Sequence, residues 1–328
     1  MKPESTKSYD WLEDALLTLC RKVFPLEISL RVHSIEQKPN RLSPHRDYLF
    51  YLVSSDTEFR MQLRLHFALF SLWSGTEDLK TAKEYSVMRH AYQHGYPAPF
   101  PYCFSPSLRP FGYPYLVMDA GDGRGWWEME ASLSAVHERT VDAMADLLAQ
   151  LHLTVPARHP LIPPVETCGV VKRLWSRVLS LGDEELTQCF QGCYRQLEQQ
   201  IALPSVLLHG CFEMENILLL NGNLRMVTNW EHAALGDPRW DVAYTSLSLH
   251  RGNDRSPANR FIARYVQKTD TPMEDLGFWE GLVALRGYAL SRWLRALDEK
   301  SYKTVAGMQT NLFPLEDVYH AVALKQFT

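Results

Sequence analysis

The feature that most constrains the fold is a series of three short apolar segments around a polar loop and a tight turn. Residues 206–208 and 217–220 are apolar and flank a loop at 209–216, and residues 224–228 form the third segment. Asn221-Gly222 joins the second segment to the third, and this dipeptide is typical of a two-residue β-hairpin turn. The pattern therefore predicts a loop of polar residues held between buried strands.

The loop and the residues that follow it carry polar side chains at regular positions. The loop at 209–216 reads His-Gly-Cys-Phe-Glu-Met-Glu-Asn. The third segment leads to Asn-Trp-Glu at 229–231, and Gly-Asp-Pro-Arg-Trp-Asp follows at 236–241. Asp237 is expected to be the N-cap of the next helix, with Pro238 at its first position.

Residues 209–243 resemble the aminoglycoside phosphotransferase and choline kinase family, which has the protein-kinase-like fold. The family pattern is His-Gly-Asp followed by Asn at the spacing seen here, a strand that ends in Asp-Trp-Glu, and Gly-Asp-Pro with an Asp shortly after. The resemblance implies an α+β bilobal fold, with a small antiparallel-sheet N-lobe and a mainly helical C-lobe. It also implies that Asp237 and Asp241 are structural acids, which cap a helix and tether the catalytic loop.

The chain departs from this family pattern at two acids. Cys211 stands where the family has the aspartate that accepts the proton of the substrate hydroxyl, and Asn229 replaces the aspartate that binds Mg²⁺. Loss of a general base usually lowers a rate by about 10²- to 10⁴-fold. Mg²⁺ is usually held by one or two carboxylates. Because Asn216 and Asn229 are neutral, they and Glu231 are expected to form a degenerate metal site, and Mg²⁺ binding is doubtful.

Weaker similarity extends upstream of the loop. Arg64 falls where the family has a basic residue that reaches the nucleotide phosphates, and Glu84 is its expected ion-pair partner. Met118 and Asp119 end a segment that resembles the strand entering the hinge, where adenine stacks. The resemblance therefore implies ATP or another nucleotide as the expected cofactor.

Two questions about the loop remain open. Glu213, Glu215 or Glu231 is a candidate to replace a lost acid as base or metal ligand; alternatively, Glu213 and Glu215 are solvated loop residues. The Cys211 thiol, two residues from His209, is either a nucleophile or a small buried cysteine. His209 is expected to pack inward against the backbone, and the neighbouring glutamates are expected to raise the thiol pKa.

The whole chain is expected to form one bilobal unit. Residues 1–119 are the predicted N-lobe, with a helix at 8–23 and strands near 27–37, 46–53, 59–66, 101–104 and 113–119. Residues 120–328 are the predicted C-lobe, with helices near 134–154, 169–181, 183–201, 238–250, 257–268, 274–298 and 314–325. Trp126-Trp127 follows the hinge, where it either lines a substrate cleft or anchors the linker. The loop at 41–47 has no glycine and does not resemble an ATP cradle.

Composition argues against several classes of partner. The 34 basic and 38 acidic residues nearly balance, so electrostatics give no reason to expect nucleic acid or an anionic membrane as a partner. No stretch approaches the roughly 20 apolar residues of a membrane span, and the first residues lack an apolar signal segment. The six cysteines form no zinc or disulfide pattern, which fits a reduced, cytoplasmic setting.

Two functions follow as hypotheses. The first is an aminoglycoside phosphotransferase-like pseudokinase, impaired in phosphotransfer, that binds a small-molecule or peptide ligand or docks a partner enzyme. The alternative is an active ATP-dependent phosphotransferase that acts on a small hydroxylated molecule or a peptide side chain. In that case Glu213, Glu215 or Glu231 substitutes for the lost acids.

Overall fold

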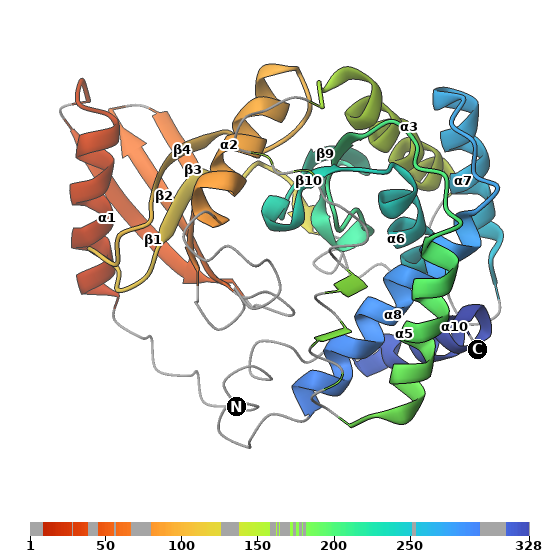
Figure 1. The fold of residues 1–328 in the computed structure, drawn as a ribbon. Helices are drawn as coiled ribbons and strands as arrows, with labels where there is room; N and C mark the ends of the chain where they lie inside the picture. The colour runs from red at the N-terminus through yellow and green to blue at the C-terminus, as the bar shows by residue number, and fades with distance from the viewer. Residues whose placement is uncertain are drawn as a thin grey trace, which may run out of the picture.

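The fold divides into a sheet-containing N-terminal part and a mainly helical C-terminal part (Figure 1). A computed structural model describes residues 9–27, 29–38, 45–55, 57–66, 80–125, 138–157, 162, 164, 171–172, 175–176, 179, 182–250, 254–295 and 313–327. Residues 41–44 of the glycine-free loop, Trp126-Trp127 and much of the expected helix at 169–181 lie outside these described residues. The α+β bilobal architecture expected from the sequence is confirmed.

The N-terminal sheet is antiparallel and has the order β1-β2-β3-β5-β4. Its strands are β1 (Leu30–Gln37), β2 (His45–Ser54), β3 (Thr57–His66), β4 (Pro101–Ser105) and β5 (Tyr115–Asp119). β3 lies at the centre and pairs with both β2 and β5. Each strand lies within a few residues of its predicted position, because alternating or continuous apolar runs bounded by turn residues specify strands well.

The two faces of β2 and β3 are both covered. Helix α1 (Asp10–Val23) buries Leu12 and Leu16 in a cluster with Phe50 and Leu63 of these strands. Polar residues occupy the opposite face, yet Met61 to His66 are all buried. Helix α2 (Lys80–Gln93) lies on the side of the sheet nearer the C-terminal part (Figure 1). A polar face buried between two parts of a molecule requires partners for its charges.

The C-terminal part is a set of packed helices around one large apolar core. Its longer helices are α3 (Glu138–Thr154), α5 (Glu184–Leu197), α6 (Arg239–Leu249), α7 (Ser256–Thr269), α8 (Leu276–Arg295) and α10 (Phe313–Phe327). α10 packs against α5 and α8, and α3 packs against α7. Within the described residues, no helix is both long enough and apolar enough to cross a membrane.

Short strands hold the polar loop against this core. They are β6 (Arg124–Gly125), β7 (Val206–Leu208), β8 (Ile217–Leu220), β9 (Asn223–Val227) and β10 (Ala234–Gly236). Asn221 and Gly222, with φ of 52° and 77°, form the predicted β8–β9 turn, since both central residues of such a turn take positive φ. β10 pairs with β7, an interaction that the sequence pattern did not predict.

The start of helix α6 differs slightly from the prediction. The helix begins at Arg239, so Pro238 is the N-cap and not the first helical residue. The Asp237 carboxylate still accepts a hydrogen bond from the Arg239 backbone N–H at 3.0 Å. It also forms an ion pair with the Arg239 guanidinium. Helix boundaries commonly shift by one or two residues in this way.

Candidate functional site

The loop after β7 is fixed by buried backbone contacts. His209 is fully buried, and its Nε2 lies 2.9 Å from the carbonyl oxygen of Thr228. Gly210 has a φ of 82°, and a Cβ there would lie 2.2 Å from the carbonyl oxygen of His232. Only glycine fits this close approach of two backbones. Burial lowers the pKa of His209, so the imidazole is neutral and serves as a structural contact.

Asp241 of α6 accepts two backbone hydrogen bonds from the loop. Its carboxylate oxygens lie 2.7 Å from the His209 N and 2.8 Å from the Gly210 N. Nε2 of His152 on α3 lies 3.3 Å from the same carboxylate. Asp237 holds a different segment, because it accepts from the Leu203 N at 3.1 Å as well as from Arg239. Both acids are therefore occupied with the scaffold and do not point at a reacting group.

The two asparagines at the family's metal positions form a hydrogen bond with each other. Asn229 Nδ2 donates to Asn216 Oδ1 at 3.0 Å, and Asn216 Nδ2 donates to the carbonyl oxygen of Cys211 at 2.8 Å. Arg64 donates from a terminal nitrogen to Asn229 Oδ1 at 3.0 Å. Each amide oxygen thus already accepts a hydrogen bond from the protein. The result is a continuous chain of hydrogen bonds from β3 to the loop.

Arg64 lies at the centre of a buried ionic network. It pairs with Glu84 of α2 at 2.5 Å, the partner expected for it, and makes two bonds to Asp47 of β2 at 3.0 and 3.1 Å. The side chain is only 3% exposed, so its charge depends on these carboxylates. They outweigh the opposing effect of burial and raise the pKa of Arg64. With Asn229 bound as well, the guanidinium has partners on all sides.

Asp47 is the site residue that the sequence analysis missed. It lies directly across the sheet from Arg64 in the β2–β3 register. Burial raises its carboxyl pKa, but Arg64 and then His45 outweigh that effect and hold the pKa well below its usual range. Opposite charges at paired strand positions are a recognised signal. The pairing of Asp47 with Arg64 could therefore have been predicted by placing the two strands in register.

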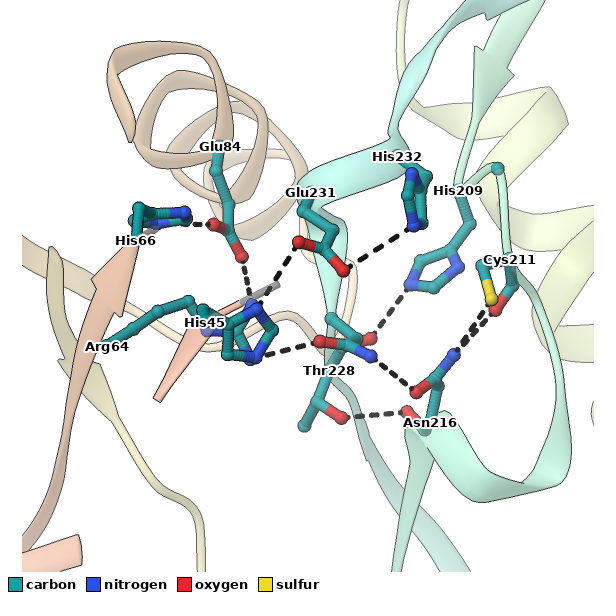
Figure 2. A network of polar contacts seen from close by, with 12 residues as sticks. His45, Arg64, His66, Glu84, His209, Cys211, Asn216, Thr228, Glu231 and His232 are labelled. Carbon is teal, nitrogen blue, oxygen red and sulfur yellow. Dashed lines mark hydrogen bonds and ion pairs between the residues drawn. The ribbon is translucent and has the colours of Figure 1, made fainter. Parts of the chain in front are cut away.

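A second set of ion pairs links the two parts of the molecule (Figure 2). His45 Nδ1 lies 3.3 Å from Glu231, which also lies 3.4 Å from His232. Burial and Arg64 oppose protonation of His45, but Asp47 and Glu231 outweigh them and raise its pKa. Burial likewise opposes ionisation of Glu231, whose pKa is nevertheless held well below its usual range, chiefly by His45. Glu231 is therefore an ionised partner of imidazoles.

Cys211 and the two loop glutamates have different surroundings. The Cys211 thiol is 8% exposed and lies 3.4 Å from Glu213 Oε1. Burial, then Glu213, raises its pKa well above the usual range, so the thiol is protonated and is a poor nucleophile. Burial, then Glu215, raises the pKa of Glu213 to about 8. Glu215 is exposed, as expected for a solvated loop residue.

The hinge residues are occupied by local contacts. Met118 is buried in the large core, and the Asp119 carboxylate accepts from the Gly121 N at 2.8 Å. Arg60 donates to the carbonyl oxygens of Gly121 and Gly123 at 3.1 and 3.3 Å. These contacts give the strand after β5 a defined path between the two parts of the molecule. Over the described residues, no group of three or more His, Cys, Asp or Glu side chains is arranged to hold a metal ion.

Comparisons with known proteins agree with this geometry. The model of the phosphotransferase enzyme family (APH) matches residues 46–277, which is more than half of the chain. The chain belongs to this family. No curated protein matches its sequence.

Solved structures of phosphotransferases share the fold of this family member. A putative aminoglycoside phosphotransferase from Ralstonia eutropha JMP134 is 16% identical, with a TM-score of 0.69 over 95% of this chain and 97% of that chain. The choline kinase LicA from Streptococcus pneumoniae is 12% identical, with a TM-score of 0.63 over 93% and 99%. The amicoumacin kinase hAmiN, solved with AMP-PNP, Ca²⁺ and amicoumacin, is 13% identical, with a TM-score of 0.58 over 93% and 94%. At these identities the likeness establishes the fold alone.

Proposed function

We propose that this member of the phosphotransferase family is a pseudokinase, impaired in phosphoryl transfer, that binds a ligand or docks a partner enzyme. The observation that carries the proposal is the hydrogen bond between Asn229 and Asn216, completed by Arg64. Residues that would hold a cation in an active kinase here bond to each other. With Cys211 in place of the base, the site lacks both of the acids that the transfer reaction uses.

The residues at the metal position do not fit Mg²⁺. This ion is hard, binds oxygen in octahedral geometry and is usually held by carboxylates. Asn216 and Asn229 offer neutral oxygens that each accept a protein hydrogen bond. Glu231 is the nearby acid of the motif, but its carboxylate pairs with His45 and His232. No step of a reaction is therefore assigned to a bound metal.

The surroundings of Arg64 also argue against tight binding of a triphosphate. Asp47 takes two of its N–H groups and Glu84 takes a third, so phosphates would have to displace buried carboxylates. Several structures in the comparison contain AMP, ADP or AMP-PNP. Any nucleotide bound by this protein is proposed to be held mainly through its base and sugar, with little dependence on Mg²⁺.

ATP binding and turnover, measured with and without Mg²⁺, test this proposal. We expect no measurable turnover by the unmodified protein and a melting-temperature shift with ATP that Mg²⁺ does not enlarge, since only a ligand of the folded state shifts stability. The double variant Cys211→Asp with Asn229→Asp restores both acids and is expected to gain a Mg²⁺-dependent shift. The uncharged variant Cys211→Asn is the matched control and should gain none. Mg²⁺-dependent ATP consumption by the unmodified protein would refute the pseudokinase.

One observation favours the alternative, an active phosphotransferase on a hydroxylated small molecule or peptide side chain. Glu213 Oε1 lies 3.4 Å from Cys211 Sγ, beside the position of the family's base, and its pKa of about 8 is near that of an effective general base. If this acid is the base, Glu213→Gln should abolish turnover and Glu215→Gln should retain it. Equal activity in both variants would exclude that role for Glu213.

The docking role and the cellular setting belong to the same proposal. Cys20, Cys103, Cys189, Cys193 and Cys211 are free thiols, which supports a reducing, cytoplasmic compartment. A partner enzyme is expected to co-purify with the protein and to raise its melting temperature when added back. A monomer that binds a small ligand and never co-purifies with another protein would leave ligand binding as the function and contradict docking.

A further inference from the structure

Arg286 of α8 is a partly buried cation that has no carboxylate partner among the residues that the structure describes. Its guanidinium carbon lies 5.9 Å from the ring centroid of Trp240, and no acidic side chain among the described residues lies within ion-pair distance. Other arginines of this region are paired, Arg239 with Asp237 and Arg292 with Asp183. Removing a guanidinium from water is unfavourable unless hydrogen bonds or an opposite charge compensate. The aromatic ring supplies only a small part of that compensation.

Arg286 lies close enough to the polar loop and to two tyrosines for its charge to influence them. Burial is the main cause that raises the pKa values of Cys211 and Tyr244, and the positive charge of Arg286 acts in the opposite direction on both. Tyr319 of α10 is held beside it, because its ring packs onto Gly287, the next residue of α8, where a Cβ would lie 2.4 Å from that ring. Arg286 of α8 thus lies over Trp240 of α6, Tyr244 lies one helical turn after Trp240, and Tyr319 of α10 packs on the residue next to Arg286.

The nearby carboxylates are not partners of Arg286. Glu213 Oε1 is held within the loop, 3.4 Å from Cys211 Sγ and 3.4 Å from Asn216 Nδ2. Glu215 is exposed to water, which screens its charge. Among the described residues, Arg286 therefore remains without an ion-pair partner. A guanidinium with neighbouring hydroxyl donors is suited to a carboxylate or a phosphate group.

We propose that Arg286, Tyr244 and Tyr319 form a binding site for a small anionic ligand, whose carboxylate or phosphate ester group contacts the guanidinium. The ring of Trp240 and those of the two tyrosines would contact a flat apolar portion of the same ligand. This inference rests on the proposed ligand-binding function and names its ligand class. It requires neither nucleotide nor metal.

Calorimetric titration in a phosphate-free buffer without ATP tests the site. The probes are phenyl phosphate, benzoate and inorganic phosphate, so that the aromatic phosphate, the aromatic carboxylate and the bare anion are compared. The unmodified protein should bind at least one aromatic anion, and Arg286→Gln should weaken binding roughly tenfold to a hundredfold, as expected for a lost charge-assisted bond. The matched control is Arg89→Gln, because Arg89 also lies over an aromatic ring, at 6.0 Å from Tyr85, but on the distant helix α2.

A second variant separates an effect on folding from an effect on binding. Tyr319→Phe removes one hydroxyl and keeps the ring, so it should fold normally and weaken binding by roughly threefold to tenfold. If Arg286→Gln fails to fold, the affinity of Tyr319→Phe for the probes tests the site. Equal affinity in the Arg286 and Arg89 variants, an unaffected Tyr319→Phe, or no binding of any probe would overturn the site. None of these outcomes depends on ATP turnover, so the anion site and the pseudokinase proposal can fail independently of each other.

Discussion

At the scale of single residues, Asn229 shows how one atom changes the site. Its backbone is left-handed, with φ of 72° and ψ of 52°, a conformation that asparagine and aspartate tolerate better than most residues. Aspartate would keep this backbone and the contact with Arg64, but it would place an oxygen opposite Asn216 Oδ1. Two such oxygens need a cation between them. The amide nitrogen of Asn229 donates a hydrogen bond instead, and the site closes without a cation.

Glu213 supports a prediction about pH and stability. Burial and Glu215 raise its pKa from 4.5 to about 8, so the folded state keeps a proton that the unfolded state releases above pH 4.5. Stability should therefore fall as the pH rises from 4.5 to 8. Glu213→Gln removes this loss and should stabilise the protein by about 1–3 kcal/mol at pH 8, with little effect at pH 5.

Urea unfolding at both pH values measures this difference. Glu198→Gln, at an exposed position, is the control and should change stability equally little at pH 5 and pH 8. If Glu213→Gln destabilises the protein to the same extent at both pH values, the carboxyl is required for its hydrogen bonds and the electrostatic explanation is wrong.

At the scale of elements, the C-terminal helix is seated by glycines on the two helices that it contacts. A Cβ at Gly192 of α5 would lie 2.0 Å from the carbonyl oxygen of Phe327, and one at Gly287 of α8 would meet the ring of Tyr319. Gln196 and Gln326 add side-chain hydrogen bonds between α5 and α10. Because α10 carries Tyr319, its close packing also determines the surroundings of the loop.

Two alanine substitutions in the same helix test this packing. Gly287→Ala should destabilise the protein by about 1–3 kcal/mol, because the new methyl group overlaps the Tyr319 ring. Gly277→Ala is the matched control: the nearest atom would be 3.4 Å away, so the better helix propensity of alanine should leave stability unchanged or raise it by about 1 kcal/mol. Urea unfolding measures both variants. Equal effects would show that α10 is not seated by Gly287.

At the scale of the whole molecule, the two parts are joined by a buried network of charges. His45, Arg64 and Glu84 come from the N-terminal part, and Glu231 comes from the C-terminal part (Figure 2). Asp47, also from the N-terminal part, pairs with His45 and Arg64. In an active kinase, nucleotide and metal occupy this region between the lobes. Here ion pairs between side chains of the protein occupy part of this region. We therefore expect the relative position of the lobes to be independent of Mg²⁺.

A double-mutant cycle on His45→Gln and Glu231→Gln tests this link. The coupling free energy should be about 1–3 kcal/mol at pH 6, because both partners are buried. The pKa of His45 is raised on folding, so its contribution is complete below about pH 6.5 and is lost as the pH rises through the raised pKa. The coupling should shrink accordingly when the cycle is repeated at higher pH.

The control for this cycle is an exposed pair of the same chemistry. His33 of β1 and Glu58 of β3, the strands on either side of β2, lie 2.9 Å apart, with side chains 46% and 52% exposed. Solvent screens such a pair, so its coupling should be only about 0–1 kcal/mol. Similar coupling for both pairs would mean that burial of the interlobe network has no special energetic effect.

The sequence by itself determined the elements and their order. Apolar runs, the Asn221-Gly222 turn and the spacing around Asn216 are local properties, so strands, helices and the family could be recognised from them. The start of α6 was misplaced by one residue, since capping depends on backbone geometry. Asp47 was missed because its role depends on the register between β2 and β3, which the local pattern does not specify.

Only the tertiary structure decided what the substituted residues do. Charge, burial and partner geometry arise between segments that are distant in sequence, such as Arg64 with Asn229, or Arg286 with Trp240. Two glutamates of the same loop have different surroundings: Glu213 is partly buried with a pKa raised to about 8, whereas Glu215 is exposed. The pKa of a side chain depends on the surroundings that folding creates, and no local pattern contains that information.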